Sequence, residues 1–235
     1  MIADEEALII TQHLRDLDET GTAADFYTIL LNTGMRLGEG LGLSLADFFP
    51  GSPDNRLVRG ALERHGLKCF GYISLESQLS NTVKPRKSDG IVGRKPLKGR
   101  KRVDASASRV VPILDKVTFN ILASRFNEET DRLVSRRYGD SKSNYLLFDR
   151  MDKNRFSRLL LQAYEGTRFT HKSPHCARHT FATNFAGMTN ADTGLCRLVL
   201  GHRDEDTTLG YVHLFEQINR QARANVLIKT NILIF

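Results

Sequence analysis

The decapeptide Pro174-His-Cys-Ala-Arg-His-Thr-Phe-Ala-Thr183 is the most informative stretch of the chain. Ser173, just before it, is a favoured residue for capping a helix N-terminus, and proline is common at the first helical position. We therefore expect a helix from Pro174 through Ala186. His175 and Arg178 lie three positions apart and share one face of such a helix, which brings an imidazole and a guanidinium together.

Three further segments carry side chains that suit the same chemistry. They are Thr33-Gly-Met-Arg-Leu-Gly-Glu39, Pro96-Leu-Lys-Gly-Arg-Lys101 upstream of Arg109-Val-Val-Pro-Ile113, and Leu200-Gly-His202 followed by Thr207-Thr-Leu-Gly-Tyr-Val-His213. With the predicted helix they supply arginines, a lysine, histidines and a tyrosine.

This set of side chains suits phosphoryl transfer without a metal ion or cofactor. A phosphodiester under attack gathers negative charge on its non-bridging oxygens, and arginine can bind two of these oxygens with one planar fork. A tyrosine can supply the attacking oxygen, but its free pKa is about 10, so it needs nearby positive charge or a base. A lysine or histidine can protonate the departing sugar oxygen.

A metal site is the main alternative for the predicted helix. His175 and His179 have the four-residue spacing found in zinc proteases, but those enzymes need a glutamate directly after the first histidine, and Cys176 stands there. The motif alone therefore argues against zinc. Taken singly, each histidine or arginine could also be an ordinary surface or core residue.

The combined motifs closely resemble the tyrosine recombinase (phage integrase) family. Its pattern is His-x-x-Arg-His-Thr on one helix, then Leu-Gly-His, then Thr-Thr-x-x-Tyr-x-His. This sequence has His175-Cys-Ala-Arg-His-Thr180, Leu200-Gly-His202 and Thr207-Thr-Leu-Gly-Tyr-Val-His213, in the same order and spacing. The segment around Arg36 is similar to the family's Thr-Gly-x-Arg-x-x-Glu box. The resemblance implies an α+β fold, mainly helical, with a small antiparallel β-sheet.

The resemblance also implies a role for each matched residue. Arg36 and Arg178 are expected to clamp the scissile phosphate, and His202 to hydrogen-bond it or stabilise the transition state. His175 is expected to act as a base or to orient the phosphate. Tyr211 is the expected nucleophile, which forms a 3′-phosphotyrosyl link and frees a 5′-hydroxyl.

The lysine and the glutamate of the pattern are less sharply defined. In the family the lysine lies on a hairpin before a basic-apolar-Pro strand, and Lys98 fits best, followed by Lys101 and then Lys95. The separation from Arg36 is longer than is typical, which indicates an insertion at about 55–95. Glu39 is either a structural residue that holds the arginine-bearing helix or a plain surface acid.

Basic residues are concentrated in one part of the chain. The net charge is +7, and residues 84–109 hold ten basic and two acidic residues, or +8, so the rest of the chain sums to −1. Such a stretch is typical of a polyanion contact, although a solvated basic loop is the alternative. The expected partner is double-stranded DNA. The expected DNA-binding residues are Lys84, Arg86, Lys87, Arg94, Lys95, Arg100 and Lys101.

Apolar spacing predicts most of the elements. Strands are expected at 70–75 and 108–113, with Pro112 at a sheet edge. Gly201 is expected to end one helix, Asn190 to cap that same helix, and Asp206 to cap the next. The expected helices are 5–15, 23–43, 117–126, 154–164, 174–186, 191–200 and one beginning at Thr207.

The chain reads as one catalytic domain over residues 1–235, with no room before Arg36 for the family's DNA-clamping domain. It lacks a long apolar run and a signal peptide, and its three cysteines are few and scattered, so a cytoplasmic location and no membrane partner are expected. The apolar segment 226–235 either packs on the same domain or reaches a neighbouring subunit. By resemblance, a homotetramer acts on DNA. The alternatives are a strand transferase like the type IB topoisomerases and a catalytically silent DNA-binding remnant.

Overall fold

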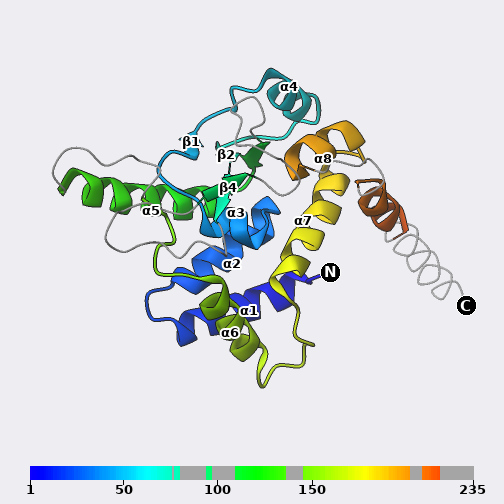
Figure 1. Ribbon diagram of the computed structural model, residues 1–235. Coiled ribbons are helices and arrows are strands. Elements are labelled where there is room, and N and C mark those ends of the chain that lie inside the picture. The colour runs from blue at the N-terminus through cyan, green and yellow to red at the C-terminus, as the bar shows by residue number, and fades with distance from the viewer. Residues whose placement is uncertain (76, 80–93, 97–108, 136–144, 202–207, 218–235) are drawn as a thin grey trace, which may run out of the picture.

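The computed structural model describes residues 1–75, 77–79, 94–96, 109–135, 145–201 and 208–217 (Figure 1). Its helices are α1 (Asp4–Leu17), α2 (Thr22–Thr33), α3 (Leu37–Leu41), α4 (Arg56–Arg64), α5 (Lys116–Ser135), α6 (Lys153–Tyr164), α7 (Pro174–Met188) and α8 (Thr193–Leu200). Residues 208–217 form a further helical segment. The strands are β1 (Phe48–Pro50), β2 (Gly71–Leu75), β3 (Ser77–Leu79), β4 (Arg94–Pro96) and β5 (Arg109–Ile113).

A small antiparallel sheet holds strands β1, β2 and β5 in the order β1-β2-β5. Ile73 at its centre pairs with Phe48 on one side and Val111 on the other. Strand β5 lies at an edge, where Pro112 can be accommodated although it has no backbone N–H to donate. Strands β3 and β4 form a separate antiparallel pair. The expected α+β class, mainly helical with a small antiparallel sheet, is confirmed.

Helix α7 takes part in two apolar clusters. The larger cluster joins α1, α2 and α6, where the Phe26 ring centroid lies 5.0 Å from that of Phe148 and 4.9 Å from that of Phe156. The second cluster joins α4, α7 and α8, and in it Phe181 and Phe185 of α7 stack at 5.3 Å. Packing on both sides fixes α7, and therefore the side chains it carries, relative to α2 and α8 (Figure 1).

The expected helix 23–43 is interrupted in the structure. Helix α2 ends at Thr33, Gly34 adopts a left-handed conformation (φ 61°), and α3 begins only at Leu37. A Cβ atom at Gly34 would lie 2.3 Å from Cδ1 of Phe181 on α7. The sequence continues its apolar spacing through this point, so periodicity alone did not reveal the break. The glycine allows both the turn and the close approach to α7.

Several other boundaries can be compared with expectation. Helix α7 begins at Pro174 after Ser173, as predicted, and α8 ends at Gly201, which has φ 65°. The prediction that Asn190 caps α8 is wrong, because the Asp192 side chain accepts from the backbone N–H of Leu195. Helix α4 was not predicted.

None of the helices in the described ranges is long and apolar enough to cross a membrane. Asp206, expected to be a cap, and the apolar segment 226–235 lie outside the described residues. The expected insertion at about 55–95 contains α4 and β2, and it remains a prediction.

Candidate active site

The arginine-bearing turn between α2 and α3 is organised by one buried carboxylate. The backbone N–H of Arg36 donates to Oε2 of Glu39 at 2.8 Å, and Nη1 of Arg36 donates to Oε1 at 2.8 Å. The Glu39 side chain is fully buried, whereas a quarter of the Arg36 side chain is exposed. Glu39 therefore holds the turn, and the alternative of a plain surface acid is wrong.

Arg109 at the start of β5 binds the same carboxylate. Its Nη2 donates to Oε2 of Glu39 at 2.6 Å, its Nη1 donates to the carbonyl of Leu200, and only 3% of the residue is exposed. Arg109 was counted in the +8 charge of residues 84–109, although it was not among the expected DNA-binding residues. Its pairing with a buried carboxylate turns the side chain into the protein.

Arg178 of α7 completes the group, which we call the arginine cluster (Arg36, Arg109 and Arg178 around Glu39). Its Nη1 donates to the carbonyl of Gly34 and its Nη2 to the carbonyl of Leu200, both at 2.6 Å. Gly34 lies two residues before Arg36, so Arg36 and Arg178 converge although 142 positions (178 − 36) separate them in the sequence. The Leu200 carbonyl also accepts from Arg109 and thereby joins α8, β5 and α7.

The arginine cluster has an excess of positive charge. Among the described residues, three guanidiniums face one carboxylate, which leaves +2 (3 − 1). Burial, followed by the neighbouring Arg109 and Arg36, lowers the pKa of Arg178 to about 9, and Glu39 opposes that change. Arg178 thus remains charged at neutral pH while being destabilised by its surroundings. A bound anion would relieve this repulsion, so the cluster suits a phosphate.

Tyr211, on the helical segment 208–217, lies beside the arginine cluster. Its hydroxyl is 2.9 Å from Nδ1 of His179 on α7. Burial raises the pKa of the Tyr211 phenol, while the positive charges of Arg178 and Arg36 act in the opposite direction. The tyrosine is therefore half-buried and within the electrostatic field of both expected phosphate-binding arginines.

His179 was not expected to be a site residue, since it was weighed only as a metal ligand or as an ordinary residue. The His175 and His179 rings lie 4.4 Å apart between centroids, nearly perpendicular, and the His179 and Tyr211 rings lie 5.5 Å apart. His175 is exposed and His179 is half-buried. No signal within α7 shows that His179 meets the tyrosine, because this contact depends on the position of the segment 208–217.

The sequence matches no protein-family model and no curated protein. Solved structures match it with TM-scores above 0.5. The Tn1549 transposon integrase in complex with transposon right end DNA matches with a TM-score of 0.57 and 17% identity, over 94% of this chain and 65% of that one. The XerH site-specific recombinase bound to palindromic difH substrate gives 0.55 and 19%, over 94% and 51%. The XerA recombinase gives 0.55 and 19%, over 95% and 62%.

The chain has the tyrosine recombinase catalytic-domain fold. It spans between about half and two thirds of the length of the three structures. The tyrosine recombinase fold brings together Arg36, Arg178 and Tyr211 from three separate motifs, with His175 and His179 beside them.

The remaining expected residues cannot be placed in this recombinase fold. Arg94 and Lys95 lie on β4, where the structure describes the backbone alone. The others lie outside the described residues, and they are Lys84, Arg86, Lys87, Lys98, Arg100, Lys101 and His202. Within the described parts of the chain, no group of three or more His, Cys, Asp or Glu side chains is arranged to hold a metal ion.

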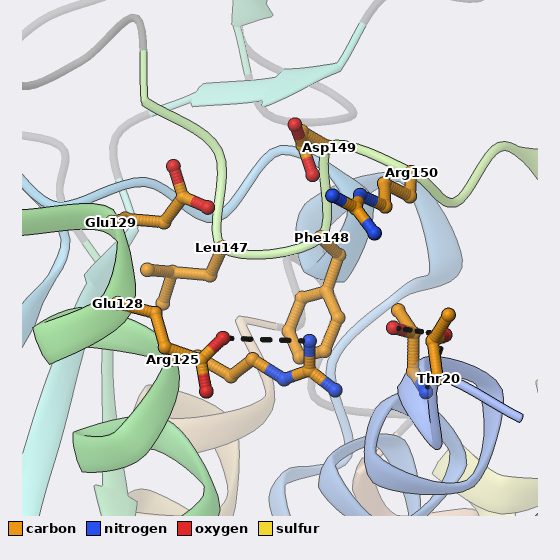
Figure 2. A pocket seen from close by; sticks show the side chains of 9 residues that line it. Thr20, Arg125, Glu128, Glu129, Leu147, Phe148, Asp149 and Arg150 are labelled. Carbon is orange, nitrogen blue, oxygen red and sulfur yellow. Dashed lines mark hydrogen bonds and ion pairs between the residues drawn. The ribbon is translucent and has the colours of Figure 1, made fainter. Parts of the chain in front are cut away.

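A cavity of about 230 Å³ lies elsewhere in the recombinase fold (Figure 2). Its lining comes from the start of α2, from α5 and from the segment 147–150, and the charged residues in it carry both signs. Arg125 on this wall pairs with Asp25 at 2.7 Å and approaches Glu128 at 4.0 Å. None of the arginine cluster lines this cavity, so the candidate active site is separate from it.

Proposed function

We propose that the chain is the catalytic domain of a site-specific DNA recombinase or integrase. It cleaves and rejoins double-stranded DNA through a 3′-phosphotyrosyl bond to Tyr211. The observation that carries the proposal is the meeting of a half-buried tyrosine with a buried cluster of excess positive charge. Phosphoryl transfer needs both, because the nucleophile must ionise and the transition state gathers negative charge.

In this mechanism Arg36 and Arg178 bind the non-bridging oxygens of the scissile phosphate. Arg36 is partly exposed, so it can reach a phosphate that arrives from solvent, whereas Arg178 is held rigidly by two backbone carbonyls. Such fixed donors need little reorganisation when charge develops, which is the main source of catalysis at sites of this kind. His202 and His175 contribute further contacts to the phosphate.

Lys98 is proposed to protonate the leaving 5′-oxygen, with Lys101 and Lys95 as the alternatives. The energy of the broken bond is conserved in the phosphotyrosine, so rejoining needs no nucleotide cofactor. The basic stretch that includes Lys84, Arg86 and Lys87 follows the DNA backbone. Recombination between two DNA segments requires four protomers, and we propose a homotetramer on DNA.

The test is covalent capture of DNA. Because the target sequence is not specified by the chain, the substrate is a pool of nicked suicide duplexes with a randomised core. Wild-type protein is expected to form a denaturant-resistant, protease-sensitive adduct, and mass spectrometry should find DNA on Tyr211. Sequencing the captured DNA then defines a substrate for all later assays.

The matched control is Tyr211→Phe, which removes one hydroxyl and should abolish the adduct while leaving DNA binding nearly intact. An adduct that persists in this variant contradicts the nucleophile assignment. DNA binding without any adduct from the wild-type chain would instead indicate a silent DNA-binding remnant.

A further inference from the structure

We infer that Arg109 is a positioning residue for DNA cleavage, which keeps the positive charge of Arg36 available to the scissile phosphate. The inference rests on the proposed function and concerns the same site. Only 3% of Arg109 is exposed, so in this arrangement its side chain does not reach a phosphate that arrives from solvent. It acts through Glu39, to which its Nη2 donates at 2.6 Å.

The two carboxylate oxygens of Glu39 are shared between Arg36 and Arg109. Oε1 accepts from Nη1 of Arg36 at 2.8 Å. Oε2 accepts from the backbone N–H of Arg36 at 2.8 Å and from Nη2 of Arg109 at 2.6 Å. The Arg36 guanidinium therefore binds the carboxylate through one nitrogen, and a quarter of its side chain stays exposed. If Arg36 bound the carboxylate with its whole fork, fewer of its N–H groups would be left for a phosphate.

The charges around Glu39 are divided in the same way. Burial opposes the ionisation of Glu39. The positive charge that does most to hold its pKa below the ordinary value is that of Arg109, ahead of Arg36 and Arg178. Among the described residues, pairing Glu39 with Arg109 leaves two guanidiniums for one phosphodiester. Without Arg109 the charge of the cluster falls from +2 to +1 (2 − 1), and Glu39 competes with the phosphate for Arg36.

Arg109 also shares an anchor with the second phosphate-binding arginine. Its Nη1 donates to the carbonyl of Leu200, which accepts from Nη2 of Arg178 at 2.6 Å. This carbonyl belongs to the last turn of α8, where the final carbonyl groups of a helix carry a partial negative charge. The end of α8 therefore offsets part of the repulsion between the two guanidiniums, and Arg109 can neutralise Glu39 without displacing Arg178.

The first test is the variant Arg109→Met, which removes the guanidinium and keeps an unbranched side chain. Single-turnover cleavage is measured at saturating concentrations of the duplex that covalent capture defines, and rates are normalised to bound DNA. The expected loss of rate is on the order of 10- to 10²-fold, less than for a donor that binds the phosphate directly. A wild-type rate in this variant overturns the inference.

The second test combines Arg109→Met with Glu39→Gln. This double variant removes both charges of the buried pair, and Arg36 and Arg178 again supply +2 (2 − 0) among the described residues. The amide oxygen of the glutamine can still accept the backbone N–H of Arg36. We expect the double variant to cleave faster than Arg109→Met and within about tenfold of wild type, because the two substitutions act on one interaction. A double variant that is as slow as Arg109→Met overturns the inference.

A substrate with a neutral scissile group separates a loss of charge from a damaged fold. In a methylphosphonate, a methyl group replaces one non-bridging oxygen and removes the negative charge. The deficit of Arg109→Met relative to wild type should be several-fold smaller on this substrate, because a neutral group depends less on the charge of Arg36. A damaged fold would slow cleavage of both substrates by the same factor, and an equal factor overturns the inference.

Arg125→Met is the matched control. It breaks another arginine–carboxylate pair, with Asp25 at 2.7 Å, on the wall of the separate cavity. It should cleave both substrates at the wild-type rate, and a slowed control would show that any broken pair impairs cleavage, which overturns the inference. A wild-type chain that forms no adduct overturns the proposed function as well. Wild-type capture on Tyr211 with an unaffected Arg109→Met overturns the role of Arg109 alone.

Discussion

Two fully or nearly fully buried glutamates organise this molecule, and their surroundings differ. Glu6 of α1 accepts from the Tyr164 hydroxyl at 2.8 Å and from the ammonium of Lys172, so one carboxylate meets one cation. Glu39 meets three guanidiniums. The first group is neutral and ties α1 to α6 and to the segment before α7. The second keeps a surplus of positive charge, which a purely structural ion pair does not need.

The comparison shows how function can be separated from stability in a buried ionic group. A structural pair satisfies each charge once, because unpaired buried charge is costly. The arginine cluster tolerates repulsion between Arg178, Arg109 and Arg36. We interpret this repulsion as the cost of a site prepared for an anion that is not part of the folded chain.

Removing the central charge of the arginine cluster should have the largest effect. Glu39→Gln leaves buried Arg109 without its anionic partner, and such a change typically costs about 3–5 kcal/mol of unfolding free energy. Chemical denaturation at pH 7 measures it. A loss below about 1 kcal/mol, as expected for Glu6→Gln, would show that Glu39 and Glu6 contribute equally to stability and would contradict the comparison.

The same variant should also change the pH dependence of stability. Burial works against ionisation, yet the guanidiniums of Arg109 and Arg36 hold the pKa of Glu39 below its usual 4.5. A depressed folded-state pKa contributes stability above the unfolded pKa that is lost as pH falls through the folded value. The difference between wild type and Glu39→Gln is therefore expected to shrink below about pH 4.5, as denaturation curves at pH 3 to 7 will show.

Arg178→Lys should have the next largest effect, on cleavage. Lysine keeps the charge but loses the planar fork that reaches the Gly34 and Leu200 carbonyls together. Losing a fixed donor of this kind typically costs about 10²–10³ in rate. Covalent capture rates, normalised to bound DNA, report it. Lys172→Arg, a charge-conserving change in the Glu6 group, is the matched control and should cleave at the wild-type rate.

Glu6→Gln should have a smaller effect on stability and none on cleavage. The amide oxygen can still accept from Tyr164, and a quarter of the Lys172 side chain is exposed and can be solvated. The expected loss is about 1 kcal/mol. Equal losses of unfolding free energy in Glu6→Gln and Glu39→Gln, measured in the same denaturant series, would show that the surplus positive charge around Glu39 does not affect stability.

Neutralising residues of the basic stretch 84–109 should have the smallest effect, which is on the salt dependence of DNA affinity. For duplex DNA, log K falls with log salt by about 0.9 for each phosphate neutralised. Neutralising Lys84, Arg86 and Lys87 should flatten that slope by up to about three units and leave the cleavage rate of bound DNA nearly unchanged. Fluorescence anisotropy at several salt concentrations measures the slope. An unchanged slope would indicate a solvated basic loop.

Capping residues and apolar periodicity predicted the helix ends and strands that depend only on neighbouring residues. Ser173 with Pro174 gave the start of α7, and Gly201 gave the end of α8, because capping residues act on the nearest turn. Alternating apolar residues gave β2 and β5. The break after Thr33 was missed because the apolar spacing continues through it, although Gly34 ends α2 in the left-handed conformation as Gly201 ends α8.

Some residues of the candidate site could likewise be identified from the sequence, and others could not. The family resemblance predicted that Arg36, Arg178 and Tyr211 converge, and they do lie together, while their catalytic roles stay a prediction. Counting charges included Arg109 in the basic stretch, because a sum of charges does not say whether a side chain points to solvent or into the protein. His179 was missed for a related reason. On a helix it lies about 100° from Arg178, and only the position of another segment turns that face into part of the site.

The carbonyl of Leu200 is an acceptor that no side-chain substitution can remove. Arg109 and Arg178 both bind this backbone oxygen, so any apolar residue that packs at position 200 should preserve the junction of α8, β5 and α7. Position 201 does not tolerate such exchange. Gly201 has φ 65°, and a Cβ there would lie 2.5 Å from Cδ of Arg109. In a saturation library, position 200 should tolerate apolar exchange, while position 201 should accept little besides glycine.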